Sequence, residues 1–381
     1  MLSPPTPYWP SYLVLLRSAF FNSVSLAKKR HALSFLLGLV LFYPLGFSLY
    51  WLDKFLFLFK SPTSLKIQRP VFIVGTPRSG STLLHRLLLD CSDDLFAITH
   101  YEWRYPSYLL QCIFSFLGLK ALASTRNYWS GAKQVAATAS SMHPNLMGDY
   151  EEDAILFEER VGFHPYLFLH FPETGLLSYM SGFDDSSNPA FQRVQTKVLM
   201  PFYKHVIRCV SSLRPSKSRF LSKEVASNGR IELLRKEFPD ALFIFITRSP
   251  SNYLSSLKEL LKISTVSKTG CDPSALGEAW WAEWLHWLAF QAESSAKAYR
   301  QLLPAKACIH VEFEDLIRNP DHVIQRLQRF LALPSSPFYQ DVINMHVATQ
   351  ASRQKGYTYN QISFDVSRFS FFMKTFYPSQ Y

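Results

Sequence analysis

Cysteine pairs are the first thing that this sequence lacks. Its five cysteines are scattered, and no two of them have the CxxC spacing of zinc and redox sites (Cys91, Cys112, Cys209, Cys271 and Cys308). This pattern argues against a structural zinc site and against a disulfide framework, and it predicts five buried or neutral thiols. The chain also has no N-x-[ST] sequon, which disfavours a glycosylated lumenal domain.

A concentrated basic tract is also missing, although the chain is basic. Lys and Arg number 40 and Asp and Glu 29, which leaves a formal net charge of +11. No basic run is longer than Lys28-Lys29-Arg30, and a diffuse charge excess is a poor footprint for nucleic acid. We therefore expect no nucleic-acid partner. An anionic membrane face or a polyanionic small molecule would account for the charge.

The N-terminal part contains 21 consecutive residues without a charge, from Ala32 to Leu52. A helix of this length could cross a hydrocarbon core of about 30 Å. Pro44 would bend such a helix, so an in-plane or re-entrant helix is an alternative, and a buried core helix is another. We predict a membrane-associating region over residues 1–66, with its apolar helix at about 32–52, and a catalytic domain over 67–381. Basic residues flank both ends of the helix, so the side of the membrane that the catalytic domain faces is left open.

The first chemical motif begins with a short apolar run over residues 70–75, which predicts a buried strand. A tight polar loop follows, and then an apolar pattern with helical spacing. Backbone N–H groups converge in such a loop, and the helix dipole favours negative charge there. The sequence therefore predicts an anion cradle made by Thr76, Pro77, Arg78, Ser79, Gly80, Ser81 and Thr82.

The loop has the glycine spacing of a Walker A motif but lacks its lysine. Ser81 follows Gly80 at the position where a nucleotide triphosphatase has the lysine that holds the β- and γ-phosphates. Arg78, inside the loop, supplies a cation instead. This arrangement disfavours ATP or GTP as a phosphoryl donor and suits a donor with one phosphate beside the transferring group.

A second apolar strand is predicted just before Arg248. Ser249 and Pro250 suit the N-cap and first position of a following helix. A guanidinium at a strand end offers a planar fork of donors to a phosphate, and Ser256, two turns into the helix, could complete the contact. No acidic residue ends this strand, so we predict no magnesium partner and no metal requirement.

The two motifs resemble those of the sulfotransferases that use 3′-phosphoadenosine 5′-phosphosulfate (PAPS). VFIVGTPRSGSTLLHRLLLD is similar to their 5′-phosphosulfate segment, in the PRSGTT form of the broad bacterial group and the tyrosylprotein sulfotransferases. FPDALFIFITRSPSNYLSS is similar to the segment that holds the 3′-phosphate, which implies this role for Arg248 and Ser256. Ser249 departs from the Asp that is usual there. The resemblance covers residues 71 to 359.

The same resemblance implies two more catalytic residues. Glu102 matches a glutamate that acts as the base in the tyrosylprotein enzymes, while His100 is its chemical rival because an imidazole has this role in the cytosolic family. Lys223 matches a lysine that could neutralise sulfuryl oxygens. A salt bridge is the alternative for Glu102, and a surface ion pair with Glu224 is the alternative for Lys223.

These observations predict an α/β, P-loop-like fold with a mostly parallel sheet flanked by helices, plus the N-terminal apolar helix. The expected activity is metal-independent, in-line transfer of the PAPS sulfuryl group to a hydroxyl of an acceptor, with an amine as the alternative. The acceptor is open, and the apolar N-terminus points to membrane lipid as a partner and to a lipid or glycan acceptor. Two rival functions are a P-loop kinase and an inactive membrane scaffold of the same fold.

Overall fold

The computed structural model describes residues 26–59, 67–129, 133–158, 164–170, 189–226, 228–334, 339–353 and 362–380, with single positions at 12, 13, 17 and 172. The chain divides into two compact units. Unit 1 comprises residues 1–66, 98–213 and 258–287, and unit 2 comprises residues 67–97, 214–257 and 288–381. The predicted division into a membrane-associating region over 1–66 and a catalytic domain over 67–381 stays a prediction.

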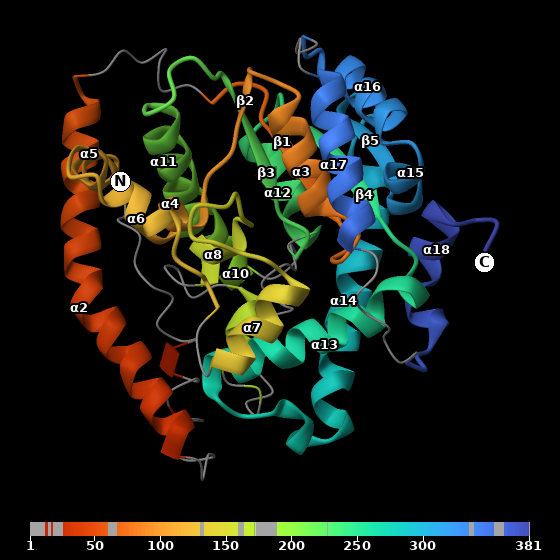
Figure 1. Cartoon of the computed structure of the whole chain (residues 1–381), viewed down its shortest axis with the longest axis horizontal. Coiled ribbons are helices and arrows are strands. Elements are labelled where there is room, and N and C mark those ends of the chain that lie inside the picture. The colour runs from red at the N-terminus through yellow and green to blue at the C-terminus, as the bar shows by residue number, and fades with distance from the viewer. Residues whose placement is uncertain are drawn as a thin grey trace. The chain divides into compact units, whose positions relative to one another are not determined.

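Unit 2 is built on a five-stranded parallel sheet with the strand order β2-β3-β1-β4-β5 (Figure 1). The strands are β1 (Val71–Gly75), β2 (Leu95–Phe96), β3 (Arg219–Lys223), β4 (Leu242–Thr247) and β5 (Cys308–Glu312). β1, at the centre, is fully buried, as are β3 and β4 on either side of it. This confirms the predicted α/β class, because continuous apolar runs such as FIFI are typical of parallel strands that are covered on both faces.

The helices of unit 2 connect and cover these strands. They are α3 (Ser81–Asp90), α12 (Ile231–Glu237), the first turns of α13 (Pro250–Thr269), the last turns of α14 (Glu278–Lys297), α15 (Phe313–Arg318), α16 (Pro320–Leu331), α17 (Tyr339–Arg353) and α18 (Ser370–Phe376). The two helix starts predicted from sequence are confirmed. α3 begins at Ser81, so that Ser81 and Thr82 of the predicted loop belong to its first turn. α13 begins at Pro250, where proline fixes the helical φ without losing a needed N–H.

Unit 1 is helical. Its elements include α2 (Leu26–Phe57), α4 (His100–Arg104), α5 (Tyr108–Phe116), α6 (Leu119–Ser124), α7 (Lys133–Met142), α8 (Ala154–Leu156), α10 (Pro189–Val194) and α11 (Met200–Ser211). α5 lies beside the C-terminal part of α2, where the Phe57 and Tyr108 rings are 5.5 Å apart (Figure 1).

The structure confirms a helix in the charge-free N-terminal segment but corrects its extent and the predicted membrane span. α2 runs from Leu26 to Phe57, longer than the predicted 32–52, and contains Pro44. Across the part of the chain that the structure describes, no helix is both long enough and apolar enough to cross a membrane. The absence of charged residues was too weak a criterion for a membrane span. The segment also holds Gly, Ser, Pro, Tyr and Trp, which favour hydrocarbon far less than Leu or Phe does.

Candidate active site

Three cationic side chains lie at the carboxyl ends of three adjacent strands of unit 2. Lys223 ends β3, Arg78 stands in the loop after β1, and Arg248 directly follows β4. Because neighbouring parallel strands end at the same edge of a sheet, these side chains share one edge, which is where open α/β sheets bind their ligands. The predicted donor residues are therefore brought together by the topology of the sheet.

The backbone of the loop depends on two glycines. Gly75 has a φ of 131°, and a Cβ there would lie 2.0 Å from the carbonyl oxygen of Ile246 in β4. Gly80 has a φ of 81°, and its Cβ would lie 2.7 Å from the Phe313 ring. Arg78 itself adopts a left-handed φ of 58°. Residues in this conformation turn successive N–H groups toward one point, which is the geometry of an anion-binding nest.

The loop side chains fix one another and the start of α3. Ser79 Oγ donates to the Thr76 carbonyl, and Thr76 Oγ1 accepts from the backbone N–H of Arg248 at 3.1 Å. Pro77 is buried beside them. Ser81 and Thr82 are the first residues of α3, whose leading N–H groups have no acceptor within the helix. The predicted cradle thus presents backbone donors and hydroxyls at a helix N-terminus.

Arg78 and Lys223 each contact a hydroxyl that the sequence assigned to the site. Arg78 Nε donates to Ser256 Oγ at 3.1 Å, which joins the two predicted motifs across 178 residues of sequence. Lys223 Nζ donates to Thr82 Oγ1 at 3.0 Å, and the Lys223 side chain is buried. Lys223 therefore lies beside the donor loop and is not a surface residue. This disagrees with the alternative interpretation, a surface ion pair with Glu224.

Arg248 contacts the donor loop, an aromatic ring and a carboxylate. Its Nη1 donates to the Arg78 carbonyl at 3.4 Å, its guanidinium lies 4.4 Å from the Phe313 ring centre, and its Nε is 3.8 Å from Glu314. Burial lowers the pKa of Arg248 from its ordinary value, and Glu314 partly opposes this while Arg78 adds to it. Its Nε is buried without a hydrogen-bond partner among the described residues. A buried donor of this kind is suited to an anionic ligand.

Asn228 is a positioning residue that the sequence did not reveal. Its side-chain oxygen accepts from the Gly75 N–H at 3.0 Å, and its side-chain nitrogen donates to the Gly75 carbonyl at 2.6 Å. Its own N–H donates to Gln291. The amide thus satisfies both backbone groups of the residue at which β1 enters the loop.

The two candidate bases, Glu102 and His100, belong to unit 1. Glu102 Oε2 accepts from both the N–H and the hydroxyl of Thr99 at 2.9 Å, in a capping box at the start of α4. His100 is buried, with its ring centre 4.3 Å from that of Tyr128. The Thr-x-x-Glu spacing was readable in the sequence and gives Glu102 a structural role. Its role as the base stays a prediction.

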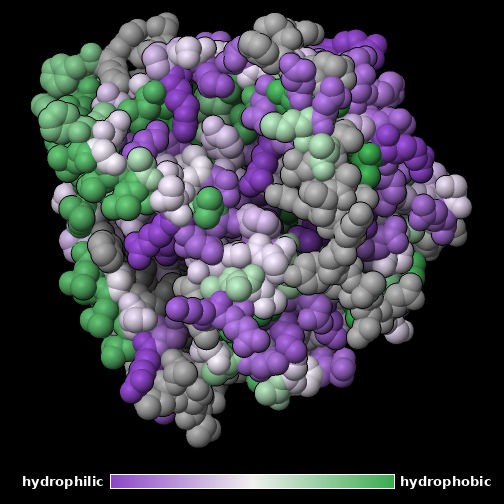
Figure 2. Space-filling view, viewed as in Figure 1, coloured by the Kyte–Doolittle hydropathy of each residue, from purple (hydrophilic) through white to green (hydrophobic). Residues whose placement is uncertain are grey.

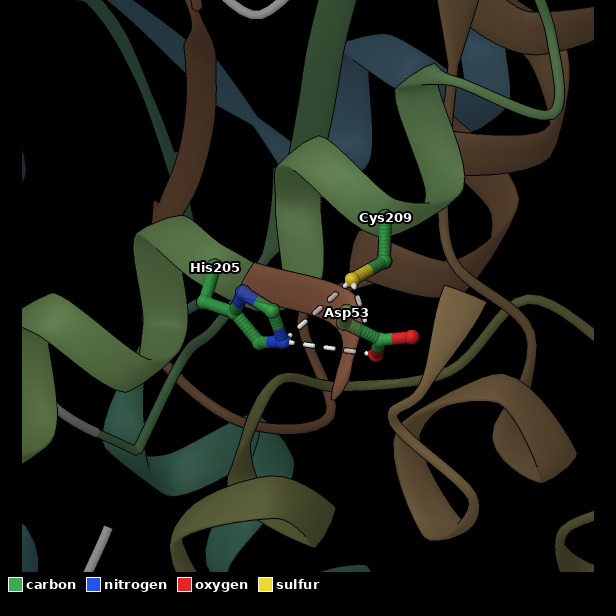
Figure 3. Close-up of side chains that lie close together, drawn as sticks. All are labelled: Asp53, His205 and Cys209. Carbon is green, nitrogen blue, oxygen red and sulfur yellow. Dashed lines mark hydrogen bonds and ion pairs between the residues drawn. The ribbon is translucent and has the colours of Figure 1, made fainter. Parts of the chain in front are cut away.

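A second buried polar cluster lies in unit 1 and consists of Asp53, His205 and Cys209 (Figure 3). His205 Nε2 is 3.6 Å from Asp53 and 3.4 Å from the Cys209 sulfur. Such spacing would suit metal ligands, but both Asp53 oxygens accept N–H groups at the start of α5, from Tyr108 and Leu109. Burial raises the pKa of Cys209 well above its ordinary value, and burial lowers that of His205. Zinc requires the thiolate, so we interpret the cluster as a tie between α2, α5 and α11.

The sequence profile of the sulfotransferase family matches residues 70–337, which contain both donor motifs. The chain belongs to the sulfotransferase family. No curated protein gives a significant match to it.

Solved structures agree with the family assignment at the level of the fold. The sulfotransferase is similar to STF1 from Mycobacterium tuberculosis H37Rv, with a TM-score of 0.61 and 17% identity over 97% of this chain and 92% of that one. It is also similar to STF9 from Mycobacterium avium, with a TM-score of 0.52 and 14% identity over 99% of this chain and 97% of that one. The family match therefore favours sulfotransfer over the rival kinase function.

Proposed function

We propose that this sulfotransferase uses PAPS as its donor and transfers the sulfuryl group to a hydroxyl of its acceptor. The observation that carries the proposal is the meeting of the two motifs, in which Arg78 donates to Ser256 while Arg248 donates to the Arg78 carbonyl. The residues fit an anion with two separate phosphate-type groups. One is suited by the nest at Gly80 and the start of α3, and the other by the buried Nε of Arg248.

When bound, PAPS would supply the sulfuryl group and a good leaving group. The N–H groups and hydroxyls of residues 76–82 would hold the 5′-phosphate, and Arg248 with Ser256 would hold the 3′-phosphate. Arg78 would stabilise negative charge on the bridging oxygen, and Lys223 would neutralise the sulfuryl oxygens. Charges fixed in advance in this way lower a barrier without reorganisation during the reaction, which is why positioning with Arg and Lys should suffice without a metal.

Glu102 is our proposed base, with His100 as its rival, on the strength of the family resemblance. A base must accept the hydroxyl proton as the oxygen attacks. In the capping box, the N–H and the hydroxyl of Thr99 both donate to the same Glu102 oxygen, Oε2. Glu102→Gln keeps an acceptor for the cap but cannot take a proton, so it separates the two roles.

The direct test is transfer from PAPS that carries labelled sulfate to lipid and glycan extracts, with products identified by mass spectrometry. A labelled product that forms equally with and without a chelator supports the donor, the transfer and the metal independence. Absence of PAPS binding in the folded, purified protein would contradict the proposal and favour an inactive scaffold. Binding without any labelled product in either extract would contradict a lipid or glycan acceptor alone.

A further inference from the structure

The outer face of unit 1 carries exposed apolar side chains on three helices. Figure 2 shows hydrophobic residues gathered over α2 and its neighbours along the left edge of the view. Phe116 at the end of α5 is 89% exposed, Leu58 just after α2 is 77% exposed, and Leu122 in α6 is 71% exposed. Monomeric proteins rarely leave such side chains together in water, because burying each one stabilises a contact.

The exposed residues of α2 follow a regular stripe. Leu33, Leu37, Leu41 and Leu45 are spaced by four residues, which places them one above another on a single side of the helix. Phe55 extends the exposed apolar surface toward the end of α2, next to α5. A helix that is apolar on its inner face and on its outer face is typical of one that is covered on both.

The charge around this face has one sign. Residues 26–59 and 107–126 contain six Lys or Arg and a single carboxylate, Asp53. Asp53 is fully buried, beside His205 and Cys209 (Figure 3), and its two oxygens accept the N–H groups at the start of α5. Lys120 and Arg126 are exposed at α6, and Arg30 is exposed near the start of α2. The Asp53 cluster therefore anchors α2 while it removes the one negative charge from the outer surface.

We propose that this face of α2, α5 and α6 docks in the plane of an anionic phospholipid bilayer. Apolar side chains would enter the acyl boundary, and the surrounding cations would meet lipid phosphates and carboxylates. Trp51 is exposed on the same helix, and its amphipathic ring suits the headgroup region. Charge complementarity favours the bilayer over a second copy of the chain, because two copies packed through this face would bring like charges together.

The length of α2 is consistent with lying in the plane. Its 32 residues correspond to about 48 Å of helix, more than the thickness of a hydrocarbon core. A helix that lies in the plane of the bilayer can be longer than the hydrocarbon core is thick, and it does not need an unbroken apolar segment. The bend expected at Pro44 is tolerated by a helix that lies on a surface.

The test is flotation of the full chain with vesicles of phosphatidylcholine, with and without about a third phosphatidylserine. We expect the wild type to float with the anionic vesicles and to be released as salt rises. Phe116→Glu combined with Leu122→Glu should lower the partition coefficient about a hundredfold. The matched control is Met345→Glu in unit 2, which also places a charge at an exposed apolar position and should leave flotation unchanged.

Two further measurements separate a loss of membrane docking from misfolding of the variant and from failure of the donor proposal. Hydrogen exchange of the wild type should show protection of residues 107–126 when vesicles are added. The variant with both Phe116→Glu and Leu122→Glu should bind PAPS as tightly as the wild type does. A loss of vesicle binding can therefore be distinguished from a loss of the donor site. Failure of the wild type to float, equal flotation of the double variant, or a solution dimer that Phe116→Glu dissociates would each overturn the proposal.

Discussion

The two buried polar clusters of the molecule differ in what their partners are. In unit 1, Asp53 accepts hydrogen bonds from two backbone N–H groups, while burial raises the pKa of the neighbouring Cys209 thiol and lowers that of the His205 imidazole. The fold itself therefore supplies the hydrogen bonds that stabilise this carboxylate. In unit 2, Arg78, Lys223 and Arg248 lie along one sheet edge. Their contacts include the hydroxyls of Ser256 and Thr82, the Arg78 carbonyl and the Glu314 carboxylate. We interpret the first cluster as one that holds helices together, and we propose that the second, which gathers three cations, binds an anionic ligand. The two clusters differ in their charged side chains, because the first has one carboxylate and the second has three cations on one sheet edge.

Arg78→Ala should give the largest effect and should act on turnover rather than on stability. Removing a fixed charge from the transition state costs about 10²–10³-fold or more in kcat. We expect sulfate transfer from labelled PAPS to fall by at least this factor with little change in melting temperature. Arg329→Ala, at an exposed arginine of α16, is the matched control and should retain full activity. Near-normal turnover of Arg78→Ala would contradict the role of the loop.

Gly75→Ala should act on stability. Its Cβ would meet the Ile246 carbonyl oxygen at 2.0 Å, and its φ of 131° is strained for alanine. We expect the free energy of unfolding to fall by about 3 kcal/mol or more. Gly118→Ala has a positive φ but nothing within 4 Å, so it should cost only about 1 kcal/mol. Equal losses in urea unfolding of both variants would show that the approach of β1 to β4 is not tight.

Asp53→Ala tests the structural side of the comparison. It leaves two N–H groups of α5 without their acceptor, and we expect a loss of about 2–4 kcal/mol in stability. Asp53→Asn keeps an acceptor oxygen and should lose less. PAPS affinity of the folded protein should be unchanged in both variants. A large drop in PAPS affinity without any loss of stability would reverse the roles that we assign to the two clusters.

His310 supports the strand that carries Arg248, and its effect should depend on pH. Its Nε2 lies 2.7 Å from Thr247 Oγ1, and burial followed by the nearby Arg326 lowers the pKa of His310 from 6.5 to about 4. The folded state keeps this imidazole neutral, so its stabilising contribution is complete above pH 6.5 and is lost as the pH falls toward 4. Between pH 7 and pH 5 this amounts to about 2 kcal/mol. Urea unfolding of His310→Gln should show a smaller loss over that range, and identical losses would contradict this pKa.

The donor loop was the part of the molecule most fully predicted from sequence. The strand, the loop and the start of α3 follow from an apolar run and from glycines at positions where only glycine fits, such as Gly75 and Gly80. The family resemblance implied that Arg248 and Ser256 act together, whereas the hydrogen bond from Arg78 to Ser256 is known only from the structure. Local chemistry and spacing were sufficient there because the physical constraint is itself local.

Contacts between distant segments were not predictable in the same way. Nothing near Asn228 in the sequence indicates that it binds both backbone groups of Gly75, 153 residues away. The burial of Asp53 against α5 likewise depends on how helices pack. α2 was recognised as a helix, but the absence of charge overstated its apolar character. Glu102 shows the opposite case, because its capping box with Thr99 follows from the Thr-x-x-Glu spacing alone, while its role as the base stays a prediction.

The most direct test of the donor site compares two ligands by calorimetric titration. PAPS and adenosine 5′-phosphosulfate differ only in the 3′-phosphate that we assign to Arg248 and Ser256. Charge-assisted hydrogen bonds of this kind are each worth about 1.5–3 kcal/mol. The wild type should therefore bind PAPS about 10–100-fold more tightly, and Arg248→Ala should remove most of that preference while it still binds both ligands. An unchanged preference in Arg248→Ala, or no binding of PAPS by the wild type, would contradict the account.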